Sequence, residues 1–147
     1  MTITIISTSQ APDARPIGKS QTATTSWADL ITVPSYEVPD ESFGGSNIVV
    51  PGVAEIISPM MVCNKTDTGA TISVRVSRYI SEVSSVDFML VNQLTVSARE
   101  TIPIPFNGQF IYTGDVVQIL SSANSTLDVT ISYTVGQAEQ DDIPGQV

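Results

Sequence analysis

The chain has 147 residues, which fits one domain with its own hydrophobic core. Six Lys and Arg against fifteen Asp and Glu give a net charge of −9, which argues against nucleic acid or an anionic membrane surface as the main partner. Histidine is absent, so neither a Ser-His-Asp triad nor a Cys-His pair can form, and the commonest metal ligand is missing. We therefore expect a protein without catalytic residues, cofactor or metal.

The compartment is indicated by what the sequence lacks. The single cysteine, Cys63, excludes an intrachain disulfide and lies in an apolar run, where a free thiol usually behaves as a small buried hydrophobe. No segment approaches the ~18–20 consecutive apolar residues of a membrane-spanning helix. The first residues lack the basic segment and cleavage pattern of a signal peptide. We expect synthesis in a cytoplasm without export by that route.

Residues 1–23 combine a short β-prone run at residues 2–6 with a polar stretch that contains two prolines and a glycine. This composition predicts an extended segment. It is either a solvated terminus or an arm that becomes ordered against a neighbouring subunit.

Residues 26–34 predict the first core strand, with Trp27, the only tryptophan, packed over one end of the core. Residues 35–47 contain Pro39, Gly44 and Gly45 and predict a long loop. The clearest prediction is a β-hairpin over residues 55–76. Its first arm is apolar at residues 56–63, its turn is polar at residues 64–69, and its second arm alternates strictly from residue 70 to residue 76.

The rest of the chain predicts further short strands. Residues 101–106 carry prolines that cannot donate to a sheet ladder, so this run belongs on an edge or outside the sheet. Asn107-Gly108 and Thr113-Gly114 indicate tight turns. The remaining expected elements are strands at residues 87–92, 94–98, 109–112, 115–120 and 126–135, and a weak helical alternative at residues 81–90.

Short strands with turn signals every ~8–12 residues predict an all-β, antiparallel β-sandwich, jelly-roll-like in character, with an extended N-terminal arm. The expected organisation is an arm at residues 1–23, a β-sandwich domain at residues 24–136 and an acidic tail at residues 137–147.

One string allows an enzyme hypothesis. Asp67-Thr68-Gly69 followed by Ala70 matches the motif of retroviral-type aspartic proteases, in which two such aspartates share a proton and activate a water. In those enzymes the aspartate follows an apolar run, whereas polar residues 64–66 precede Asp67 here. A Thr-Asp-Thr-Gly run between strands also makes an ordinary turn, with Gly supplying positive φ and Asp bonding its own backbone. We favour the turn and keep the retropepsin-like protease as a remote alternative.

Several runs together resemble a known group of proteins. They are Val62-Cys63-Asn64 before a polar turn, the alternating residues 70–76, the Ile-Pro-Ile-Pro run at residues 102–105 with its Asn-Gly turn, residues 114–119, and residues 123–133. In this order they resemble the small β-sandwich virion proteins of tailed bacteriophages, particularly those of cyanobacteria and marine bacteria. The resemblance covers roughly residues 53–135.

The resemblance implies a structural protein of the virion, made in the host cytoplasm. The expected role is a capsid decoration or cement subunit, commonly a homotrimer, that binds the major capsid protein or other virion subunits through its arm and sheet edges. A neck or collar subunit and a tail-fibre or receptor-binding subunit remain as alternatives. A short chain without heptads or a fibrous repeat favours decoration.

Overall fold

The computed structural model describes residues 3–5, 16–40, 46–81 and 84–138. Every regular element in these ranges is a strand, and none of them is a helix. The predicted all-β class is therefore confirmed. The strands are β1 (Ile3–Ile5), β2 (Ile17–Thr22), β3 (Ala28–Thr32), β4 (Ser35–Asp40), β5 (Ser46–Val50), β6 (Gly52–Ile56), β7 (Met60–Asn64), β8 (Ala70–Ser81), β9 (Ser84–Val96), β10 (Thr101–Ile104), β11 (Phe110–Tyr112), β12 (Asp115–Ser121) and β13 (Leu127–Gln137).

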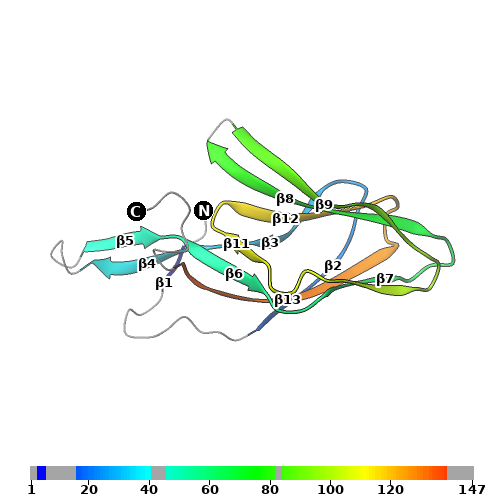
Figure 1. Cartoon of the computed structure of the whole chain (residues 1–147), viewed down its shortest axis with the longest axis horizontal. Coiled ribbons are helices and arrows are strands. Elements are labelled where there is room, and N and C mark those ends of the chain that lie inside the picture. Colours follow the sequence, from blue (N-terminus) through cyan, green and yellow to red (C-terminus); the bar gives the residue numbers. More distant parts are fainter. Residues whose placement is uncertain (1–2, 6–15, 41–45, 82–83, 139–147) are drawn as a thin grey trace.

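The strands form two larger sheets and one small one (Figure 1). One larger sheet has the order β3-β12-β8-β9, and the other has the order β10-β7-β13-β6-β11, with β2 also paired to β13. All ladders in these two sheets are antiparallel. Their buried side chains belong to one hydrophobic core, for example Val62 and Val129 from one sheet and Ile72 and Ile119 from the other.

β13 is the central strand of its sheet and follows the predicted alternation. Leu127, Val129, Ile131 and Tyr133 are buried, and the residues between them are half-buried or exposed. Its first half pairs with β7 and its second half with β6, because these two strands run on from each other through a short bend at residues 57–59. The prediction of a strand at residues 126–135 is confirmed.

The predicted hairpin over residues 55–76 is wrong. Both arms are strands, but β7 pairs with β13 and β10, whereas β8 pairs with β12 and β9. The polar residues 65–69 therefore carry the chain from one larger sheet to the other. The alternation of apolar and polar residues indicates that a strand has one buried face, but it does not indicate which strand pairs with it.

Residues 35–47 were expected to form a long loop, and this is also wrong over the described part. β4 and β5 pair antiparallel, with Tyr36 opposite Val50 and Glu37 opposite Val49, and β1 adds in parallel to β4. We call this small sheet the ribbon; it projects from the rest of the molecule beside the N-terminal end of β6 (Figure 1). The expected strands at residues 87–92 and 94–98 are a single strand, β9, and the helical alternative at residues 81–90 is wrong where it is described.

The proposed arm at residues 1–23 contains a strand of a larger sheet. β2 pairs with β13 over six residues, from Thr22 opposite Asp128 to Ile17 opposite Tyr133. The sheet domain therefore begins at β2 within the described residues. At the other end, β13 runs to Gln137, and most of the expected tail at residues 137–147 lies outside the described residues.

The proline and turn predictions are confirmed. β10 carries Pro103 and pairs only with β7 among the described strands, so it is an edge strand. Gly108 and Gly114 have φ of +92° and +96°, the left-handed region that tight turns require and that glycine reaches without strain.

Trp27 is placed differently from the prediction, because its half-buried ring lies under the guanidinium of Arg75 at 4.1 Å on the outer face of the β8 sheet.

The junction of β2, β7 and β13 contains an acid-sensitive contact. Thr22 Oγ1 donates a hydrogen bond to Asp128 Oδ1 at 2.7 Å, and Lys65 Nζ donates to the same oxygen at 3.1 Å. The hydrogen bond from Thr22, aided by Lys65 and partly opposed by burial, holds the pKa of Asp128 below its ordinary value of 3.8. A lowered folded-state pKa stabilises the fold above the unfolded-state pKa, and this stabilisation is lost as pH falls through the folded-state value.

We expect Asp128→Asn to lower the free energy of unfolding by about 0.5–1 kcal/mol at neutral pH, the range for a half-exposed pair screened by solvent. Urea unfolding of wild type and variant should show this difference shrinking once the pH passes below the ordinary pKa of an aspartate. A difference that stays constant from neutral pH into that acid range would contradict the assignment.

Candidate functional site

The turn at residues 65–69 is organised by Asn64 and not by the residues of the protease-like motif. The Asn64 side chain is 1% exposed, and its Nδ2 donates to the carbonyls of Thr68 at 2.9 Å and Val96 at 3.1 Å. Its Oδ1 accepts from the backbone N and the Oγ1 of Thr66, at 2.9 and 2.8 Å. One buried amide therefore fixes both ends of the connection between the two larger sheets.

Asp67 lies at the tip of this turn. Its side chain is 86% exposed, and its Oδ1 accepts a hydrogen bond from Arg99 Nε at 2.8 Å. A proton-sharing aspartate needs burial beside a second carboxylate, whereas Asp67 is open to water and paired with a cation. The prediction of a turn is correct, but its mechanism was wrong, since Gly69 does not adopt positive φ and Asp67 bonds Arg99 instead of its own backbone.

A second polar feature lies where β8 meets β12. Asp115 is 4% exposed, and its carboxylate accepts from Arg78 Nε at 2.9 Å, Arg78 Nη2 at 3.2 Å and the backbone N of Tyr112 at 3.2 Å. The hydrogen bond and charge of Asp115 raise the pKa of Arg78. The Arg78 guanidinium also lies 5.6 Å from the ring centroid of Phe88. The pair fixes the half-exposed guanidinium at the end of an apolar cleft.

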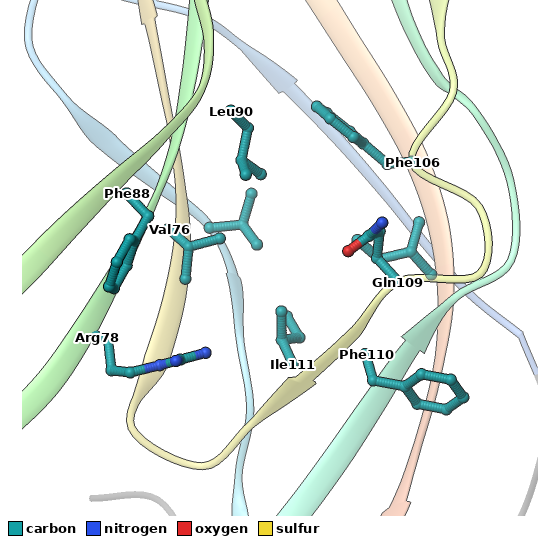
Figure 2. A pocket seen from close by; sticks show the side chains of 10 residues that line it. Val76, Arg78, Phe88, Leu90, Phe106, Gln109, Phe110 and Ile111 are labelled. Carbon is teal, nitrogen blue, oxygen red and sulfur yellow. The ribbon is translucent and has the colours of Figure 1, made fainter.

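This cleft, of about 180 Å³, opens between the two larger sheets at their β9 and β11 edges. Figure 2 shows Val76, Phe88 and Leu90 on the β8–β9 side facing Phe106, Gln109 and Ile111 on the side of β11 and the loop before it. Arg78 reaches across one end. Apart from Arg78 and Gln109, the residues that line the cleft are apolar: Ile56, Val76, Phe88, Leu90, Phe106, Phe110, Ile111 and Val117.

The cleft continues into an exposed apolar strand. β9 is exposed along residues 84–95 except at the half-buried Val91, and only Val96 at its end is buried. Figure 1 shows the end of β8 and the beginning of β9 splayed away from β11. Eight large apolar side chains of β8, β9 and β11, on both faces of the β8–β9 hairpin, are between 40% and 57% exposed: Tyr79, Ile80, Val86, Phe88, Met89, Leu90, Leu94 and Phe110.

Sequence reasoning missed this surface. Residues 86–91 read Val-Asp-Phe-Met-Leu-Val, which places apolar residues on both faces of a strand. Such a run is typical of a strand that is buried on both sides. An apolar run of this kind indicates an interaction surface when its strand lies at the edge of a sheet. The sequence does not show that position, whereas the sheet order shows that β9 is an edge strand among the described strands.

Other kinds of site receive no support within the described residues. No group of three or more His, Cys, Asp or Glu side chains is placed to hold a metal ion there, and Cys63 is a half-buried free thiol. The described part of the chain offers no helix of the length and apolarity that crossing a membrane requires. A scan against protein-family models and a search of curated proteins find no match for this sequence.

Proposed function

We propose that the two larger sheets form a jelly roll and that the chain is a structural subunit of a tailed-phage virion, a capsid decoration or cement protein. The strand order supports the jelly roll. The ribbon strands β4 and β5 are left out of this count, and β6–β7 and β10–β11 each count as one bent strand. The eight strands that remain between β2 and β13 lie in the order first, eighth, third, sixth in one sheet and second, seventh, fourth, fifth in the other. Jelly rolls are a recurrent architecture of viral capsid domains.

A fold of this kind hosts many functions, so the role must rest on a surface. The observation that carries it is the ribbon. β5 is an edge strand among the described residues, and Ile48 and Val49 on it are 40% and 51% exposed. An edge with unpaired backbone groups and apolar side chains can add to a sheet of a neighbouring subunit without any special chemistry.

The base of the ribbon is rigidly attached, as a cement contact requires. Thr113 Oγ1 accepts a hydrogen bond from the Gly52 backbone N at 2.6 Å and donates to the Pro34 carbonyl at 3.0 Å, which joins both strands of the ribbon to the turn before β12. Tyr36 is 2% exposed at the same place. A force applied to the ribbon by a bound subunit would therefore be transmitted to the two larger sheets.

The proposal is tested by adding the purified protein to phage particles that lack it and measuring co-sedimentation. Val49→Lys puts a charge on the ribbon edge opposite Glu37, so the ribbon keeps a favourable cross-strand pair while its apolar contact is lost. Ile57→Lys is the matched control, because Ile57 is 41% exposed but lies in the bend between β6 and β7.

We expect wild type and Ile57→Lys to sediment with the particles and Val49→Lys to lose at least about tenfold in affinity, the equivalent of ~1.4 kcal/mol. Failure of the wild-type protein to bind, or equal binding by both variants, contradicts the proposed role of the ribbon.

A further inference from the structure

A cavity of about 1150 Å³ lies where the ribbon joins the two larger sheets, and we call it the end cavity. Its lining residues belong to β2, β3, β4, β8, β12 and β13 and to the turns before β4 and β12. None of them lines the cleft beside Arg78, so the end cavity is a different space. Small-molecule sites in proteins commonly measure ~300–1,000 Å³, so the end cavity has room for a ligand.

The lining of the end cavity is mainly apolar and carries no charge. No Asp, Glu, Lys or Arg is among the described residues that line it. An ionised ligand would therefore be buried there without a counter-charge, which is strongly unfavourable. The polar side chains of the lining all end in hydroxyl groups: Thr32, Tyr36, Tyr79, Thr113 and Tyr133. This chemistry selects an uncharged ligand with few polar groups.

Two of the tyrosine hydroxyls lack a hydrogen-bond partner among the described residues, those of Tyr36 and Tyr133. The two residues are only 2% and 9% exposed. Every described side-chain nitrogen or oxygen that is shut off from solvent does have a partner, so these two hydroxyls must open into the space that they line, the end cavity. Burial raises the pKa of both hydroxyls above the ordinary value of 10.0, so each stays protonated at neutral pH. Each can then donate one hydrogen bond and accept another.

We propose that the end cavity binds an uncharged, largely apolar small molecule whose hydroxyl or carbonyl group hydrogen-bonds to Tyr36 and Tyr133. Pockets of this kind combine apolar walls with a few polar groups that fix the orientation of the ligand. The net charge of −9 further disfavours an anion. The site goes beyond the role proposed for the ribbon, since it needs neither the β5 edge nor a particle.

A polypeptide segment fits the end cavity less well than a small molecule does. Each residue of a buried segment brings a backbone N–H and C=O that need partners. The lining offers few such partners, and the hydroxyl of Thr113 is already bonded to the backbone of Gly52 and Pro34. The two buried tyrosine hydroxyls suffice for one or two polar groups, as a small amphipathic molecule carries.

The proposal is tested by fluorescence titration of the full-length protein with N-phenylnaphthylamine, an uncharged probe whose emission rises in apolar surroundings. Two competitors of equal chain length, n-octanol and octanoate, separate an uncharged hydroxyl from a carboxylate. We expect saturable binding of the probe and its displacement by n-octanol, with octanoate weaker by at least about tenfold at neutral pH.

Two kinds of variant locate the binding. Thr32→Trp places an indole in the end cavity from an exposed position on the edge strand β3, and Thr101→Trp is its matched control. Thr101 is also an exposed threonine on an edge strand, β10, and it lines neither the end cavity nor the cleft beside Arg78. The double variant Tyr36→Phe/Tyr133→Phe removes both hydroxyls and keeps both rings. Circular dichroism checks that each variant is folded.

We expect Thr32→Trp to lose at least about tenfold in affinity for the probe and Thr101→Trp to bind as the wild type does. The double tyrosine variant should still bind the probe, but n-octanol should displace it at least about tenfold less effectively.

The proposal is overturned if the wild type does not bind the probe, as would follow if a chain segment outside the described residues fills the cavity. Equal probe affinities of the two tryptophan variants, equal displacement by n-octanol and octanoate, or unchanged displacement by n-octanol in the double tyrosine variant also overturns it. Binding to phage particles through the ribbon is measured separately, so either proposal can fail while the other stands.

Discussion

Gly52→Ala is expected to lower the free energy of unfolding by about 3 kcal/mol or more. A Cβ at this position would lie 2.2 Å from the Pro34 carbonyl oxygen and 2.8 Å from Tyr36 Cε2. The first of these atoms is backbone, and the second belongs to a ring buried at 2% exposure, so neither yields without moving the base of the ribbon. Overpacking commonly costs ~1–3 kcal/mol, and a clash with backbone belongs at the upper end.

Chemical denaturation followed by circular dichroism measures this effect, and Gly18→Ala supplies the control. Gly18 also lies in a strand, but a Cβ there meets nothing within 4 Å. We expect Gly18→Ala to change the free energy of unfolding by no more than about 0.5 kcal/mol. The expected direction is a stabilisation, because alanine restricts the conformations of the unfolded chain more than glycine does. Similar stability losses in the two variants would contradict the steric clash expected at Gly52.

Asn64→Ala should cost about 3 kcal/mol as well. It removes the donor to the Val96 carbonyl in the protein interior, and it also removes the donor to Thr68 and the acceptor for Thr66. A buried polar group left without its partner costs ~1–3 kcal/mol, and several are affected together. Because this amide holds the crossing between the two larger sheets, we also expect faster unfolding of the variant.

Asp67→Asn is the comparison for Asn64→Ala, since it changes the same turn at its exposed tip. It removes only a solvent-exposed ion pair with Arg99, and such pairs contribute less than about 1 kcal/mol. Equilibrium unfolding should therefore show a clearly larger loss of stability for Asn64→Ala than for Asp67→Asn. Peptide cleavage at acid pH by the wild-type protein that Asp67→Asn abolishes would instead revive the protease hypothesis.

The strands were predictable where one face is buried and the other is wet. The predicted alternation holds in β13 from Leu127 to Tyr133, and it holds over residues 70–76 of β8 except at Ser73, which is buried. The glycine turns at Gly108 and Gly114 follow from backbone conformation alone. Pairing was not predictable from the same pattern. β7 and β8 are consecutive and strand-like, yet they lie in different sheets, and the buried residues of both strands belong to one hydrophobic core.

The candidate surfaces were harder to predict than the fold. Residues 35–47 contain the proline and glycines of a loop, but the pairing of β4 with β5 overrides this local preference. The composition of β9 gives the apolar residues without saying that they are exposed, since exposure depends on the position of the strand in the sheet. Asn64 carries no marker in the sequence, because its importance comes from burial and from the two carbonyls that converge on it.

The central claim, that the chain is a decoration subunit of a phage capsid, is tested most directly by its copy number in purified particles, measured by quantitative mass spectrometry against the major capsid protein. A copy number of the same order as that of the capsid protein is the predicted result. Absence from the particle, or the few copies of a neck or tail ring, would contradict it.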